Sequence, residues 1–134
     1  KMKSRLISLV GIVAAWFVLD YVFHGVLLMP EYMATMNLWR PAAEMNTALS
    51  VTVMVLSALS FVFIYCRLVP NKTLENGIKL GAFVGALVAI YAGVGPYIWL
   101  PITTKIAAVW AIANFVKFTA AGAIVGYVVT DNMD

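Results

Sequence analysis

Apolar residues run almost without interruption through four long stretches of the chain, and short polar connections separate them. The hydrocarbon core of a bilayer, about 30 Å thick, takes roughly 20 apolar residues in a helix. Each stretch is long enough for one crossing. The pattern therefore predicts an all-α, polytopic membrane protein with four transmembrane helices in an antiparallel bundle, over residues 6–29, 42–69, 76–98 and 104–130.

Proline and capping residues mark the expected helix ends. Pro30 cannot continue the first helix, and Pro41 suits the first position of the second, with Glu44 in its first turn. Thr103 or Thr104 can cap the fourth helix. The short connection after the second helix predicts that the second and third helices are antiparallel neighbours.

The stretch 31–39 is too short to cross a membrane and too apolar to extend freely into water, so we expect an interfacial segment. Aromatic side chains gather at membrane surfaces. Four are expected there: Tyr32, Trp39, Tyr97 and Trp99.

Composition supports a membrane protein with a single domain, residues 1–134. The chain is 63% hydrophobic and 11% charged, against about a quarter charged in soluble domains. A net charge of +3 without a basic stripe does not point to nucleic acid; the expected partner is the lipid bilayer. The first apolar stretch is too long for a signal peptide, so we expect a retained helix.

The basic residues predict the orientation. Six lie before the first helix or around the connection between the second and third helices, and two lie near the other connections: Lys1, Lys3, Arg5, Arg67, Lys72 and Lys79 against Arg40 and Lys105. The positive-inside rule then places both termini in the cytoplasm. A bacterial cytoplasmic membrane is the expected location.

Small residues recur at every fourth position of the third stretch, and a second such pair lies in the fourth stretch. Small residues let membrane helices approach closely. The ladder, Gly77, Gly81, Gly85, Ala89 and Gly93 with Gly122 and Gly126, predicts a tight helix contact. The contact could lie within the chain or between protomers of an oligomer.

Two charged residues, Asp20 and Lys117, lie inside apolar stretches, where an unpaired charge is costly. At about 1.5 Å per residue, both lie about 20 Å from the expected cytoplasmic helix ends. Alanine and asparagine share the side of Lys117, which indicates that it points inward. The equal depth predicts that the carboxylate and the ammonium form an ion pair.

Further polar residues lie near this level. His24 is one turn from Asp20, and Asn114 is one turn from Lys117, so we expect these two to match in depth. Ser57 and Tyr91 lie near the same level. The sequence thus predicts a polar layer linking helices, which could be structural, could serve translocation or ligand binding, or could bind another subunit.

His24 is the only histidine, and with Asp20 it makes a weak metal candidate. Haem ligation by His24 and a methionine, Met29, Met33, Met36 or Met45, is a formal alternative. We expect His24 instead to bond Asp20, Asn114 or a backbone carbonyl, from where it could relay a proton. No cofactor is predicted, and without a nucleophile–base arrangement the chain is not expected to be an enzyme.

With Asp20 in its first helix, the chain resembles the small multidrug transporters in length and helix count. It lacks the motif surroundings of that family, whose members do not place a lysine opposite the acid, so their activity is not carried over. We expect proton- or ion-linked transport of a small solute by an oligomer. The alternatives are a non-catalytic subunit of a larger membrane complex and a metal- or haem-binding protein around His24.

Overall fold

The computed structural model describes residues 2–131, and this part of the chain is helical, without strands. Four helical stretches are long and apolar enough to cross a membrane, as the sequence predicted. They are α1 (Met2–Asp20) with the π-helix η1 (Tyr21–Leu27); α3 (Thr47–Leu68); α4 (Leu74–Val88) with the π-helix η4 (Ala89–Val94) and the 3-10 helix η5 (Gly95–Ile98); and α5 (Thr104–Val128).

The prediction for the start of the second long helix was wrong. Ala42–Glu44 forms a separate 3-10 turn, η3, and α3 begins only at Thr47. The side-chain oxygen of Asn46 accepts a hydrogen bond from the backbone N–H of Leu49 at 2.9 Å. Asparagine is a strong helix-capping residue, so the helix begins there. Pro41 and Glu44 therefore lie outside α3.

Smaller differences occur at the other ends. α1 begins at Met2, four residues before the predicted start, and α5 ends at Val128, two residues before the predicted end. Thr103 caps α5, since its hydroxyl accepts a hydrogen bond from the N–H of Ile106 at 3.1 Å. Lys1, which the orientation prediction counted, lies outside the described residues.

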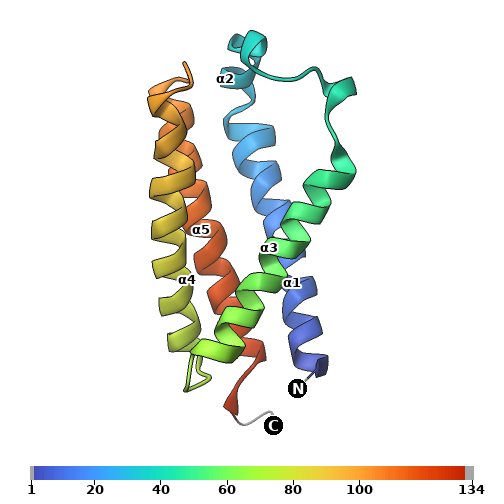
Figure 1. Ribbon diagram of the computed structural model, residues 1–134, viewed down its shortest axis with the longest axis vertical. Helices are drawn as coiled ribbons and strands as arrows, with labels where there is room; N and C mark the ends of the chain where they lie inside the picture. The colour runs from blue at the N-terminus through green and yellow to red at the C-terminus, as the bar shows by residue number, and fades with distance from the viewer. Residues whose placement is uncertain (1, 132–134) are drawn as a thin grey trace.

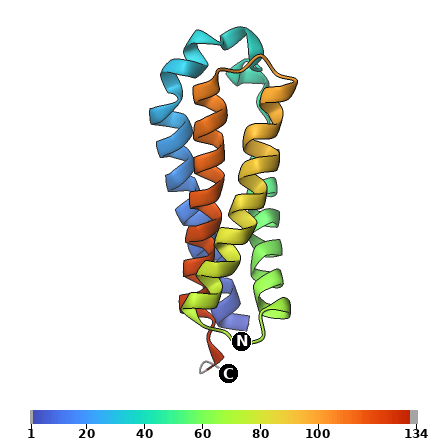
Figure 2. The same ribbon diagram turned by 90° about the vertical axis from the view of Figure 1, so that its left-hand side faces the viewer.

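The molecule has two ends, which we call the terminal end and the α2 end (Figures 1 and 2). α1 begins and α5 ends at the terminal end, close to the turn between α3 and α4. The α2 end carries α2 (Met29–Ala34), the short helix η2 (Met36–Leu38) and η3. α5 packs against both α1 and α4.

α3 packs against the other helices mainly through its second half. Its buried side chains are Ala58, Phe61, Val62 and Tyr65, whereas residues 47–53 are exposed. Figure 1 shows α3 running obliquely and separating from the other long helices toward the α2 end. The prediction that the second and third helices are packed neighbours was wrong: α3 packs on α1 and α5, whereas α4 packs mainly on α5.

Two apolar clusters stabilise the fold at different heights. The larger lies toward the terminal end and joins α1, α3 and α5 through residues that include Trp16, Phe61 and Val125. The smaller lies at the α2 end around Leu28 and Ile106. Asp20 and Lys117 fall between the two clusters along α1 and α5.

The glycine ladder forms a contact within the chain, between α4 and α5. A Cβ atom added at Gly77 would lie 2.7 Å from the Cα of Gly126, and one added at Gly93 would lie 2.6 Å from the Cα of Ala111. Side-chain carbons do not fit at such distances, so these positions hold the two backbones together. Ala89 is half-buried where the π-helix η4 begins.

Candidate functional site

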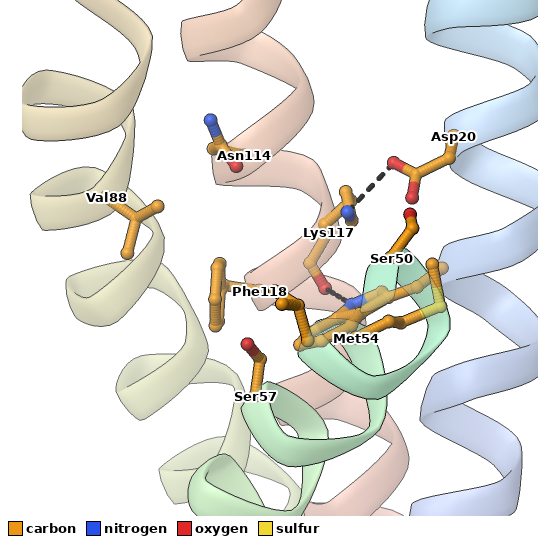
Figure 3. A pocket seen from close by; sticks show the side chains of 10 residues that line it. Asp20, Ser50, Met54, Ser57, Val88, Asn114, Lys117 and Phe118 are labelled. Carbon is orange, nitrogen blue, oxygen red and sulfur yellow. Dashed lines mark hydrogen bonds and ion pairs between the residues drawn. The ribbon is translucent and has the colours of Figure 1, made fainter. Parts of the chain in front are cut away.

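Asp20 and Lys117 form the predicted ion pair. The Nζ of Lys117 lies 2.8 Å from Oδ1 of Asp20, and their side chains are 18% and 27% exposed, in that order. Figure 3 shows the two groups pointing toward one another from α5 and α1. The pair thus links two helices at a level between the apolar clusters.

Trp16 contacts Lys117 in two ways. Its indole N–H donates a hydrogen bond to the backbone carbonyl of Lys117 at 2.8 Å, and the Nζ of Lys117 lies 5.2 Å from the ring centre. A cation over an aromatic ring is stabilised by about 0.5–2 kcal/mol, more when water is excluded. Trp16 therefore fixes both the backbone and the charge of Lys117.

The ion pair faces a cavity of about 290 Å³ to which all four long helices contribute. Its lining is mixed, and the apolar side chains of Met54, Val88 and Phe118 lie among charged and polar groups (Figure 3). The polar lining residues are Asp20, Ser50, Ser57, Asn114 and Lys117. At about 30 Å³ per water molecule, the volume suits several waters or one small solute.

His24 continues the polar groups from Asp20 toward the α2 end. Its Nε2 lies 3.9 Å from Oδ1 of Asp20, and its Nδ1 lies 2.7 Å from the hydroxyl of Tyr32. The indole N–H of Trp110 donates to the same hydroxyl at 2.7 Å. A string of four groups, Lys117, Asp20, His24 and Tyr32, therefore leads from the cavity to α2.

His24 and Asn114, which were expected at the same depth, have different hydrogen-bond partners in the structure. The carboxamide N–H of Asn114 donates to the backbone carbonyl of Trp110 at 3.0 Å, within its own helix. His24 bonds Tyr32 because the chain bends at Leu28, between η1 and α2, which brings the two rings to a centre-to-centre distance of 6.0 Å. Sequence spacing along two separate helices could not reveal this contact.

Tyr91 does not belong to the polar layer. Its side chain is 81% exposed. It lies two positions from both Ala89 and Gly93, and two positions in a helix turn a side chain by about 200°. Because Gly93 packs against α5, Tyr91 must point away from it. The ladder spacing itself carried this signal.

The sequence analysis did not include Trp16 and Trp110 in the polar layer, although their spacing points to them. Trp16, Asp20 and His24 are four residues apart, and Trp110, Asn114 and Lys117 follow a four-then-three spacing. Both patterns place residues on one helix face. Each tryptophan lies on the face of a charged or polar partner.

The four predicted interfacial aromatics divide into two kinds. Tyr97 and Trp99 are exposed. Tyr32 and Trp39 are half-buried and pack edge to face with ring centres 5.4 Å apart.

Burial raises the pKa of the Tyr32 hydroxyl above its ordinary value. The hydrogen bond from Trp110 lowers this pKa, and the negative charge of Asp20 raises it further.

Within residues 2–131, the structure holds no group of three or more histidine, cysteine, aspartate or glutamate side chains that could bind a metal ion. Asp20 and His24 remain a two-residue arrangement, engaged with Lys117 and Tyr32. Glu31, near them in sequence, pairs instead with Lys105 at 3.4 Å.

Comparison with known proteins adds no relative. No protein-family model matches the chain. No curated protein and no solved structure matches it either. The geometry described above is therefore the basis for any functional proposal.

Proposed function

We propose that this chain is an integral membrane protein that crosses the bilayer four times and carries out proton- or ion-linked transport of a small solute. Asp20 and Lys117 are the coupling pair. The observation that carries the proposal is that this ion pair faces a 290 Å³ cavity instead of being enclosed by apolar side chains. A purely structural pair needs no such space.

The membrane setting is supported by the outer faces of the helices. Large apolar side chains are exposed on each long helix, for example Val10, Phe63, Phe83 and Ile112. In water such a surface would associate, whereas in lipid it is the preferred one. We place both termini in the cytoplasm, on the positive-inside rule, in a bacterial cytoplasmic membrane.

The proton pathway follows the polar string. Protonation of Asp20 would neutralise its charge, release Lys117 to the cavity and allow a solute or ion to take its place. His24 can pass the proton between Asp20 and Tyr32, since imidazole exchanges protons near neutral pH. In this scheme the α2 end, where Tyr32 lies, is the outer mouth of the pathway.

An oligomer is part of the proposal because four helices enclose only a narrow path. The exposed first half of α3 leaves one side of the cavity to be completed by lipid or by a second copy. The alternative, an accessory subunit of a larger complex, relied on the glycine ladder as a docking seam. α4 and α5 use that ladder for each other, which favours transport over the alternative.

Proton flux in liposomes tests the proposal. The purified chain is reconstituted with a pH-sensitive dye inside, and a potassium diffusion potential is applied. We expect flux above that of protein-free vesicles, and at least a tenfold loss in Asp20→Asn and in Lys117→Met, because general acid–base groups contribute about 100-fold or more to proton transfer.

The matched control is a second interhelical ion pair, Glu31 with Lys105 at the α2 end. The variant Glu31→Gln/Lys105→Met removes the same charges outside the polar string and should retain wild-type flux. Flux that is unchanged in both Asp20→Asn and Lys117→Met would exclude the proposed coupling pair.

A further inference from the structure

The α2 end holds a second pocket, separate from the cavity at Lys117. It has a volume of about 460 Å³, and residues of α2, η2, η3 and α5 contribute to its lining. Four of the seven methionines in the chain line it: Met29, Met33, Met36 and Met45. Met29 and Met33 are four residues apart in α2, which places them on one helix face.

The other polar atoms of this pocket already have partners. The indole N–H of Trp39 donates to the hydroxyl of Thr35 at 2.9 Å, and that of Trp110 donates to Tyr32. The hydroxyl of Tyr32 also bonds His24. The thioether sulfurs of the methionines are therefore the electron-pair donors that the pocket still offers to a ligand.

Thioether donors select soft, monovalent metal ions. They bind Cu(I), whereas Mg²⁺ and Ca²⁺ require oxygen and Zn²⁺ prefers thiolate and imidazole. Methionine has three rotatable side-chain bonds. The four sulfurs can therefore move toward one ion, although the pocket is wider than the ion. The rings of Trp39 and Trp110, 6.0 Å apart, add faces that attract a cation.

We propose that the methionine pocket at the α2 end is a Cu(I)-binding site, with thioether ligands drawn from Met29, Met33, Met36 and Met45. The four side chains are each substantially exposed, so an ion can reach them from the surface of the molecule. The proposal does not depend on transport through the Asp20–Lys117 cavity, because none of the four methionines lines that cavity.

A competition titration tests the site. The full-length chain in detergent, with Cys66→Ser to remove the one thiol, is titrated anaerobically with Cu(I) against a chromophoric Cu(I) chelator. We expect one Cu(I) to bind per chain. X-ray absorption spectroscopy should show that the atoms bound to Cu(I) are sulfur. Affinity should be the same at pH 5 and pH 8, since thioethers carry no proton, whereas histidine and thiolate sites weaken in acid.

Leucine substitution separates the sulfur from the packing. The variant with all four pocket methionines changed to leucine keeps the volume and apolar character of the side chains, so it should fold like the parent by circular dichroism. We expect Cu(I) affinity to fall more than about 100-fold, because even the loss of a residue that only supports a ligand costs about 10–100-fold.

The matched control changes methionines outside the pocket, Met2→Leu and Met54→Leu, and should leave the affinity unchanged. The proposal would be overturned if the fourfold leucine variant kept the wild-type affinity, or if the chelator removed all Cu(I) from the parent protein. Loss of affinity between pH 8 and pH 5 would also overturn it, because it would identify His24 or a carboxylate as a ligand.

Discussion

Lys117 and Asp20 each carry a charge that would be unfavourable alone at this level of the bundle. Removing one partner of a buried ion pair is more costly than removing both, because the remaining charge loses its compensation. The side chains of Lys117 and Asp20 are 18% and 27% exposed, so the pair is close to a buried ion pair. The pair thus gives the site a measurable signature in stability.

Single and double neutralisation should differ in the free energy of unfolding. We expect Asp20→Asn or Lys117→Met to lower it by about 2–3 kcal/mol, and the double variant to lie within about 1 kcal/mol of the parent. Equilibrium unfolding in mixed detergent, followed by tryptophan fluorescence, measures the three values. Additive effects of the two substitutions would show that the charges do not interact.

The hydroxyl of Tyr32 should titrate above its ordinary pKa. Because the folded pKa is raised above the unfolded value, its contribution to stability is complete below about pH 10 and is lost as the pH rises through the folded pKa. The difference in tyrosinate absorbance between the parent and Tyr32→Phe isolates this titration. A midpoint at or below the ordinary value would contradict the burial of this group.

The sequence predicted the ion pair because an unpaired charge in an apolar stretch is unfavourable, and because Asp20 and Lys117 were expected at the same depth. It did not predict that His24 bonds Tyr32, since that contact depends on how the chain bends at Leu28. Tyr91 was placed by depth alone, without its angular position, and this explains the error.

α1 and α4 both continue as π-helices, η1 and η4, at the level of the site or beyond it toward the α2 end. π-Helices are rare and occur often at functional sites. His24 lies within η1, one turn after Asp20. Apolar composition does not distinguish an α-helical from a π-helical turn, so these segments could not be predicted, whereas the lengths of the four apolar stretches could.

Close packing of α4 on α5 makes a prediction at Gly77. Gly77→Ala places a methyl group 2.7 Å from the Cα of Gly126, and we expect a loss of about 1–3 kcal/mol in the free energy of unfolding. Gly95→Ala is the control, because its nearest neighbours lie at 3.8 Å. Equal stability of the two variants would contradict the seam between α4 and α5.

For the molecule as a whole, both ends of the described chain lie at the same end of the bundle (Figure 2), as expected for four long helices that alternate in direction. Orientation in the membrane remains a prediction from basic residues. The oblique position of α3 could not be read from the sequence, because its apolar residues cover all sides and do not select one partner.

Cysteine labelling in intact cells tests the orientation. In a Cys66→Ser background, Asn37→Cys at the α2 end should react with a membrane-impermeant maleimide, and Asp131→Cys at the terminal end should react only after the cells are opened. Both positions are exposed in the structure, so access to the thiol does not limit the reaction. The reverse labelling pattern would invert the proposed orientation.

Asp20 and Lys117 could only hold α1 and α5 together, or they could couple proton movement to transport. Proton flux in the double variant Asp20→Asn/Lys117→Met decides between these two roles. Neutralising both groups keeps the helices together without an unpaired charge, so loss of folding does not confuse the result. We predict a folded protein whose flux in liposomes falls to that of protein-free vesicles. A folded double variant with wild-type flux would contradict the assignment of Asp20 and Lys117 to transport.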